Sequence, residues 1–376
     1  METDKNQRIL LVLRELAQKL PFLVFLVAGT VSVTAMGADG ITFIFTSDPQ
    51  FCGEAVNRVS ACRRWGRKDV FIDWQVAGIN RVTGYSWPRN WRTRFGAEGT
   101  FDTPLGIILG GDLTESAGGF VGSNGGGDQW RLFTGRYEHG RDDAVRYPVY
   151  VGLGNHDLET APRDRRLPRD LYRDRMWDYV TRRHSGATAP VPVEDFDPES
   201  RSYSWDWNGV HLVQLHRFAG DTRHDLPSSL PWLRQNLKQH AGDGRPVIIF
   251  QHYGFESSNS IGSNRRSRSK WTPNEMNQFA GVIRGYNVLA LFHGHDHWAQ
   301  RPYEWRGYDV FSPGAAHFKQ FAIVHIDLET LDVVYAEVVN EEGDVRLVRE
   351  SAFSKKVRWP SQLGITQGEV INSPSG

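Results

Sequence analysis

Five short polar segments of the chain contain the residue types that bind divalent metal ions. They are Asp48-Pro49-Gln50, Gly111-Asp112, Gly154-Asn155-His156-Asp157, Gln251-His252 and His293-Gly294-His295-Asp296-His297. Carboxylate, amide and imidazole groups suit manganese, iron, zinc and magnesium, and no thiolate is among them. A single segment of this kind is typical of a turn or a surface loop. Five of them, each after an apolar run, point to a metal-dependent reaction.

The apolar runs before these segments have the length and composition of buried β-strands. In an open α/β sheet the carboxyl ends of the strands meet at one crevice, which the following loops line. We therefore expect the five polar segments to lie together. The predicted strands are 41–45, 105–109, 147–151, 211–215, 247–250 and 288–292.

Helices are predicted between the strands, as in an α/β layered domain. Thr272-Pro273-Asn274-Glu275 is a capping box with proline at the first helical position, and Gly285 would end that helix. A second helix is predicted around residues 232–237. Residues 321–327 and 333–339 are predicted to form a late antiparallel pair that completes a second sheet.

The domain boundaries follow from these elements. One domain is expected over residues 38–353, followed by a polar tail at 354–376. Inserted loops are expected at 114–146, which is rich in glycine, and at 158–202, which is charged and contains proline.

The N-terminal residues 1–37 are predicted to be a signal peptide or a membrane anchor. Basic residues precede an apolar run at 22–35, and small residues around Gly37 suit cleavage. The run is shorter than the roughly 20 residues of a membrane span, which favours a cleaved signal, an exported or secreted protein and no stable span. After export, Cys52 and Cys62 could form a disulfide or remain free thiols.

The five segments resemble, in order, the motifs of the calcineurin-like metallophosphoesterases, D-x-H, G-D, G-N-H-[DE], a lone H and G-H-x-H. The resemblance extends from Ile41 to Asp327. It implies a double β-sheet sandwich flanked by helices in four layers, and a hydrolase of phosphate esters with two divalent metal ions and a bridging hydroxide.

The resemblance also implies a role for each motif residue. Asp48, Gln50, Asp112 and His297 would hold the first ion, and Asp112, Asn155, His252 and His295 the second. His156 would be the general acid, because its position in the family lies beside the leaving-group oxygen. Asp157 or Asp296 could orient His156.

Gln50 is the one departure from the motifs, because the family usually has histidine at this position. An amide oxygen binds a transition metal less strongly than imidazole does. The D-P-Q-F form occurs in a branch of the family, which argues against simple loss of the site. Gln50→His is expected to tighten the first ion or to leave activity intact.

The substrate is not defined by these motifs, and two classes of function stay open. Arg265 and Arg266 could bind a phosphate or an anionic head group, although a solvated basic loop is the simpler interpretation. A small-molecule or lipid head-group phosphate ester, mono- or diester, fits the motifs. The equal totals of 44 basic and 44 acidic residues argue against nucleic acid, and the sequence gives no sign of the oligomeric state. The alternative is a non-catalytic binding module with a degenerate metal site.

Overall fold

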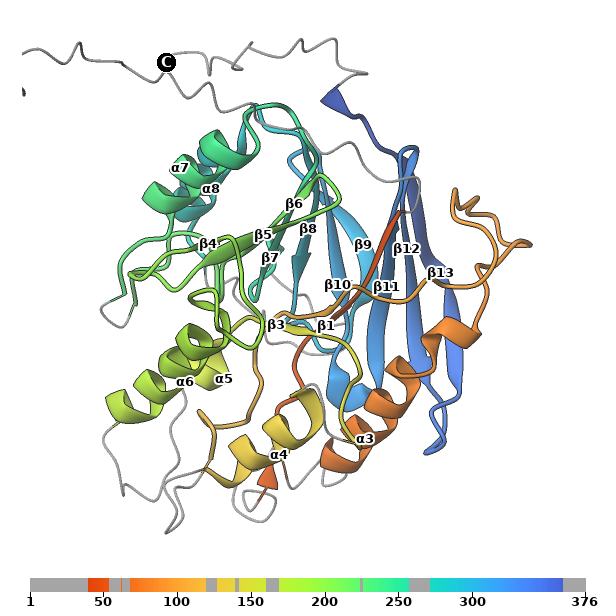
Figure 1. The fold of residues 1–376 in the computed structure, drawn as a ribbon, viewed down its shortest axis with the longest axis horizontal. Coiled ribbons are helices and arrows are strands. Elements are labelled where there is room, and N and C mark those ends of the chain that lie inside the picture. The colour runs from red at the N-terminus through yellow and green to blue at the C-terminus, as the bar shows by residue number, and fades with distance from the viewer. Residues whose placement is uncertain are drawn as a thin grey trace, which may run out of the picture. The chain divides into compact units, whose positions relative to one another are not determined.

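The computed structural model describes residues 40–53, 62, 68–119, 127–138, 142–159, 169–223, 226–256 and 271–360. All of them belong to one compact unit, Ala35–Gly376. The described strands form two mixed β-sheets (Figure 1).

The first sheet has six strands in the order β13-β12-β11-β1-β2-β3. Neighbours β1, β2 and β3 are parallel, whereas β11 pairs with β1 antiparallel. The carboxyl ends of β1, β2 and β3 therefore lie at the same edge of the sheet. The bounds are β1 Ile41–Thr46, β2 Ile107–Leu109, β3 Val149–Val151, β11 Gln320–Ile326, β12 Thr330–Val338 and β13 Val345–Lys356.

The second sheet has seven strands in the order β4-β5-β6-β7-β8-β10-β9. Its central strands β6, β7, β8 and β10 are parallel, so β7 and β8 also present their carboxyl ends together. The bounds are β4 Asp195–Phe196, β5 Tyr203–Trp207, β6 Val210–Gln214, β7 Val247–Gln251, β8 Val288–His293, β9 Gln300–Trp305 and β10 Tyr308–Pro313.

The two sheets face each other across an aromatic core. The ring of Phe45 on β1 lies 5.0 Å from that of Phe292 on β8, and the ring of Phe43 lies 5.9 Å from that of Phe250 on β7. Strand β7 is buried on both faces, because Val247 and Ile249 pack into a second cluster with α7 and α8. This is why its sequence is continuously apolar and does not alternate.

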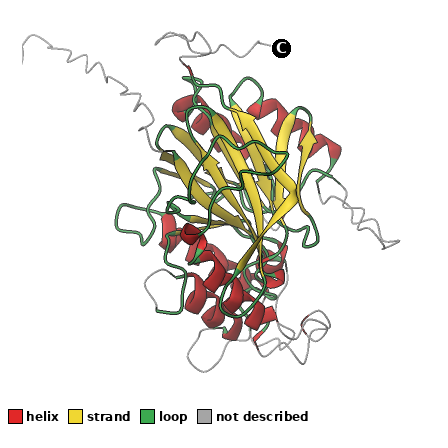
Figure 2. Cartoon of the chain, turned by 90° about the vertical axis from the view of Figure 1, so that its right-hand side faces the viewer, coloured by secondary structure: helices red, strands yellow, loops and turns green. Residues whose placement is uncertain are grey.

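Helices cover the outer sides of the sandwich. α7 (Leu230–His240) and α8 (Pro273–Ile283) pack on the second sheet. α3 (Lys68–Ile79) contacts β12 of the first sheet and the short helix η4 (Ala316–Phe318), which precedes β11. Figure 2 shows most of the helices gathered beside one end of the strands. The remaining ones are η2 Val82–Gly84, α4 Asp128–Tyr137, α5 Asn155–Leu158 and α6 Arg169–His184.

The predicted fold class, an α/β double β-sheet sandwich flanked by helices, is confirmed, but the assignment of the late strand pair is wrong. β11 and β12 pair with each other as expected, yet they extend the first sheet beside β1 and do not complete the second. The second sheet is completed by β4, β5, β9 and β10. Pairing of neighbouring strands follows from their hydrophobic pattern, whereas the sheet they join depends on distant contacts with β1.

The two expected loop segments also contain regular structure. α4 lies within 114–146, and α6 and β4 lie within 158–202. α6 buries an apolar stripe, including Tyr172, Met176 and Val180, despite its many charged residues. Strand β13 ends at Lys356, beyond the expected end of the domain at residue 353.

The expected N-terminal signal or anchor, residues 1–37, lies outside the described residues. Within the described part, no helix combines the length and apolar character that crossing a bilayer requires. Cys52 and Cys62 form a disulfide, which ties the segment after β1 to the chain before α3.

Candidate metal centre

The polar segments after β1, β2, β7 and β8 meet where the two sheets face each other. Two groups of possible ligands form there, and within each group the ligand atoms lie within 4.8 Å of one another. One group is Asp48, Asp112 and His297, and the other is Asp112, His252 and His295. Asp112 belongs to both groups, so its carboxylate lies between two potential ion sites.

Asp112 is fully buried, and both of its carboxylate oxygens have partners. Oδ1 accepts a hydrogen bond from the backbone N–H of His156 at 2.7 Å, and Oδ2 lies 3.3 Å from Nε2 of His252. Burial raises the pKa of Asp112, but the attraction of His252 and His156 outweighs burial and holds the pKa well below its usual range. The side chain is therefore an anion, as a ligand shared by two cations must be.

His252 is oriented by the chain before any ligand binds. Its Nδ1 donates to the carbonyl of Gly110 at 2.9 Å, which leaves Nε2 facing Asp112 and the amide oxygen of Asn155, 3.3 Å away. A carbonyl behind one ring nitrogen fixes which nitrogen can bind a metal. Burial lowers the pKa of His252, but the facing carboxylates of Asp112 and Asp48 raise it to about 9. A metal ion would replace that proton.

Asp48 belongs to the group that also contains Asp112 and His297. Its Oδ1 accepts from Nε2 of His297 at 3.0 Å, and its Oδ2 accepts from the backbone N–H of His295 at 2.8 Å. Burial raises the pKa of Asp48, yet His297 more than compensates, and the pKa falls to about 2. His317, which donates from Nδ1 to the Asp48 carbonyl at 2.7 Å, supports this turn from behind.

The backbone of the site adopts unusual conformations. Asp48, Gln50, Asp112 and His295 all have positive φ angles, between 47° and 66°. Left-handed backbone costs on the order of 1–2 kcal/mol for a non-glycine residue, so the surrounding structure must impose it. These turns aim four side chains into one small volume.

Close packing against Asp112 explains why position 154, directly before Asn155, is a glycine. A Cβ atom at Gly154 would lie 2.2 Å from Oδ1 of Asp112 and 2.6 Å from the backbone nitrogen of Asp112. Only glycine allows the loop after β3 to approach the loop after β2 this closely. The close approach lets the Asn155 oxygen and an Asp112 oxygen both lie 3.3 Å from Nε2 of His252.

Gln50 lies in the site with its amide nitrogen toward the other ligands. Its Nε2 is 3.2 Å from Oδ2 of Asp112 and 3.4 Å from Nε2 of His297. Its oxygen accepts a hydrogen bond of 2.9 Å from the ammonium of Lys68, which also contacts Glu115 at 3.4 Å. Neither Lys68 nor Glu115 belongs to a strand-end motif, so no motif predicts their place beside Gln50.

His156 is held by Glu115 and not by either of the two aspartates that the sequence left open. Its Nδ1 donates to the backbone carbonyl of Glu115 at 2.9 Å. Burial lowers the pKa of His156, but Asp112 and Glu115 raise it above its usual value. Asp157 accepts from the backbone N–H groups of Leu113, Thr114 and Gly154, so the contacts give it a structural role that joins two loops.

The donor set fits divalent metal ions. Asp48, Asp112 and His252 are fully buried, and the atoms that converge are carboxylate oxygens, imidazole nitrogens and the Asn155 oxygen. Buried carboxylates that converge in this way need cations to offset their charge. Asp48, Asp112, Asn155, His252, His295 and His297 would hold two ions that share Asp112.

An exposed aromatic side chain lies directly beside the candidate ligands. Tyr253 and Trp271 are buried in the core, whereas Trp298, directly after His297, is 65% exposed and lies against the ring of Phe318. Arg265 and Arg266, the suggested phosphate-binding residues, lie outside the described residues.

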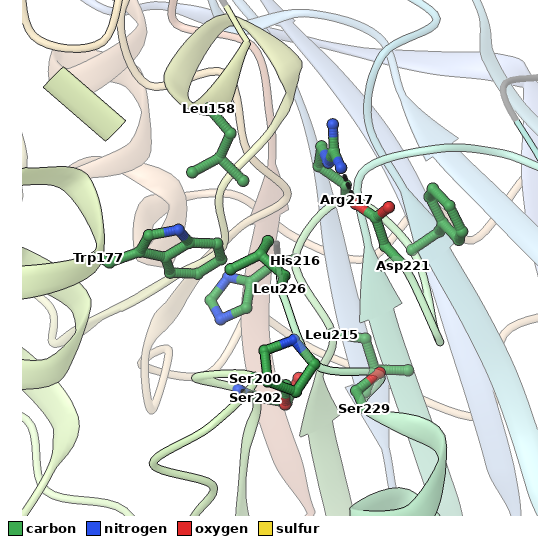
Figure 3. Close-up of a pocket in the computed structure, with 12 residues that line it drawn as sticks. Leu158, Trp177, Ser200, Ser202, Leu215, His216, Arg217, Asp221, Leu226 and Ser229 are labelled. Carbon is green, nitrogen blue, oxygen red and sulfur yellow. Dashed lines mark hydrogen bonds and ion pairs between the residues drawn. The ribbon is translucent and has the colours of Figure 1, made fainter. Parts of the chain in front are cut away.

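A separate small cavity lies beside α5, where Arg217 and Asp221 face each other near Trp177 and His216 (Figure 3). Its volume is about 20 Å³, and none of the candidate metal ligands lines it. Such a volume holds about one water molecule, so this cavity is not the place of an ester substrate.

The chain is similar to known proteins. Residues 41–299 match the profile of the calcineurin-like phosphoesterases. The structure of a dimetal phosphatase from Danio rerio is similar to this one with a TM-score of 0.50 at 12% identity, over 85% of this chain and 99% of that chain. The structure of PhoD has a TM-score of 0.49 at 11% identity, over 87% of this chain and 72% of that chain. No curated protein matches the chain. At these identities the likeness to the Danio rerio structure concerns the fold alone.

Proposed function

Because the chain belongs to the calcineurin-like phosphoesterase family, we propose that it hydrolyses phosphate esters at a dinuclear metal centre between its two sheets. One observation carries the proposal. Asp112 is shared by two groups of convergent ligand atoms, which is the arrangement that two neighbouring cations require.

Two divalent ions bound there would polarise the phosphoryl group and acidify a water molecule for in-line attack. The protein contributes position and charge. Hydrogen bonds from the backbone N–H groups of His156 and His295 hold the carboxylates of Asp112 and Asp48 in place. These ligands are oriented before a substrate arrives, so no reorganisation is needed during the reaction.

His156 is the general acid in this proposal. The Glu115 carbonyl accepts a hydrogen bond from Nδ1–H, and Nε2 remains available to give a proton to the leaving oxygen. The ring is 26% exposed, whereas the Asp112 side chain, which accepts from the His156 backbone N–H, is inaccessible. A partly exposed imidazole next to a buried carboxylate suits proton transfer to a bound ester.

The substrate is a small-molecule or lipid head-group phosphate ester, and a monoester and a diester remain the two candidates. The test is a paired assay of the purified full chain with a chromogenic monoester and the matching diester, in manganese and after chelation. We expect hydrolysis of at least one ester, loss of activity on chelation and recovery when manganese is restored. One bound ion or none, without hydrolysis of either ester, would instead favour a non-catalytic binding module with a degenerate metal site.

Export of the protein is part of the same proposal. In residues 1–37, basic residues precede an apolar run, as in a secretory signal peptide. The Cys52–Cys62 disulfide is typical of a protein in an oxidising compartment. Mass spectrometry of the N-terminus of the cell-derived protein tests it, with cleavage near Gly37 as the expected result. An intact N-terminus with reduced cysteines would contradict export.

A further inference from the structure

We propose that Lys68 withholds Gln50 from metal binding, so that the ion site of Asp48, Asp112 and His297 has one protein ligand fewer than motif comparison implies. This inference rests on the proposed metal centre and concerns how the chain divides ligands between its two ions. Lys68 acts here as a positioning residue, since it touches Gln50 and does not itself reach a ligand group.

The orientation of the Gln50 amide follows from the chemistry of its neighbour. An ammonium group has only hydrogen-bond donors, so the atom that faces Nζ of Lys68 at 2.9 Å must be the amide oxygen. The amide nitrogen then points at Asp112 and His297, where it lies within 3.4 Å of both. An amide NH₂ group presents hydrogens and cannot donate an electron pair to a cation.

The surroundings of Lys68 hold it in this position. Its side chain is 3% exposed, and its other partner, Glu115, is 4% exposed. Turning the Gln50 oxygen toward the ions would leave this buried ammonium with Glu115 as its one partner among the described residues, and would place NH₂ hydrogens against it. Losing a hydrogen bond to a buried charged group is costly, so the amide keeps its orientation.

The two ion sites are therefore unequal. Asn155 can add its oxygen to Asp112, His252 and His295, because that oxygen already lies 3.3 Å from Nε2 of His252. Within the part of the chain that the structure describes, the other site keeps Asp48, Asp112 and His297. A centre built in this way would bind one ion tightly and the other weakly.

The test is a calorimetric titration of Mn²⁺ into metal-free full-length protein, which measures affinity independently of turnover. Wild type is expected to bind two ions with unequal affinity. Gln50→Met removes the amide, and we expect it to leave the weaker affinity unchanged within about threefold, because Gln50 is not a ligand. A ligand lost from this site would lower the affinity by about 10–100-fold or more, the range for mutations around metal ligands.

The decisive variant is Lys68→Met with Glu115→Gln, which removes the ammonium and keeps the net charge of the cluster. Gln50 is then free to turn its oxygen inward, and the weaker affinity should rise by about tenfold or more. Glu115→Gln alone is the control for loss of the carboxylate and should give no gain in the weaker affinity, because Lys68 still holds Gln50. Adding Gln50→Met to the double variant should abolish the gain.

The outcomes distinguish failure of the inference about Lys68 from failure of the proposed metal centre. Lower affinity in Gln50→Met, or no gain in the double variant, overturns the inference while the metal centre stands. If the double variant does not fold, which a thermal melt reports, the Gln50→Met result decides alone. Failure of wild type to bind manganese at all would refute the proposed function itself.

Discussion

Asp112→Asn is expected to abolish turnover and to reduce the number of bound ions. The substitution keeps the shape of the side chain, and an amide oxygen can still accept from the His156 N–H. It removes the negative charge that both ligand groups share, and an NH₂ group then faces one of the two ions. The loss of metal affinity should be larger than that caused by mutating a residue that only contacts a metal ligand, which is about 10–100-fold.

Activity and metal content measured on the same sample check this prediction. Asp143→Asn is the matched control, because Asp143 is 67% exposed and belongs to neither ligand group. The control should retain two ions and full activity. An Asp112→Asn protein with two bound ions and normal turnover would show that the shared carboxylate is not needed.

His156→Ala is the variant with the second-largest expected effect, and its loss should depend on the leaving group. A general acid contributes most when the departing oxygen is strongly basic, and typical contributions are about 10²–10⁴-fold. We therefore expect a loss in this range for an alkyl phosphate ester. A nitrophenyl ester, whose leaving group needs no proton, should be affected far less.

The two esters serve as each other's control within one protein, and metal content should remain at the wild-type level. The measurement is kcat for both substrates in wild type and in the variant. Equal losses on both esters would show that His156 does not transfer the proton. Its role would then be to help position Asp112 through the backbone.

The local elements of the fold could be predicted because their sequences are consistent with a single structure. Helix α8 begins as the capping box indicates, with the Thr272 side chain accepting from the Glu275 N–H. The strand-end placement of Asp48, Asp112 and His252 follows from apolar runs whose carboxyl ends share an edge. Helix α6 was missed because charged residues outnumber the buried stripe on its inner face.

The finer chemistry of the site depends on contacts that no motif contains. The orientation of the Gln50 amide is decided by Lys68, on a helix that the motifs do not include. The orientation of His156 is decided by a backbone carbonyl, that of Glu115, which has no signature in the sequence. Asp157 looks like a catalytic partner in the chain but is occupied by three backbone N–H groups.

The most direct test of the central claim is the anomalous scattering of crystals grown with Mn²⁺. We expect two manganese peaks about 4 Å apart, one on each side of the Asp112 carboxylate. One should lie against Asp48 and His297, and the other against His252 and His295. A single peak away from Asp112, or no peak among these residues, would contradict the dinuclear centre.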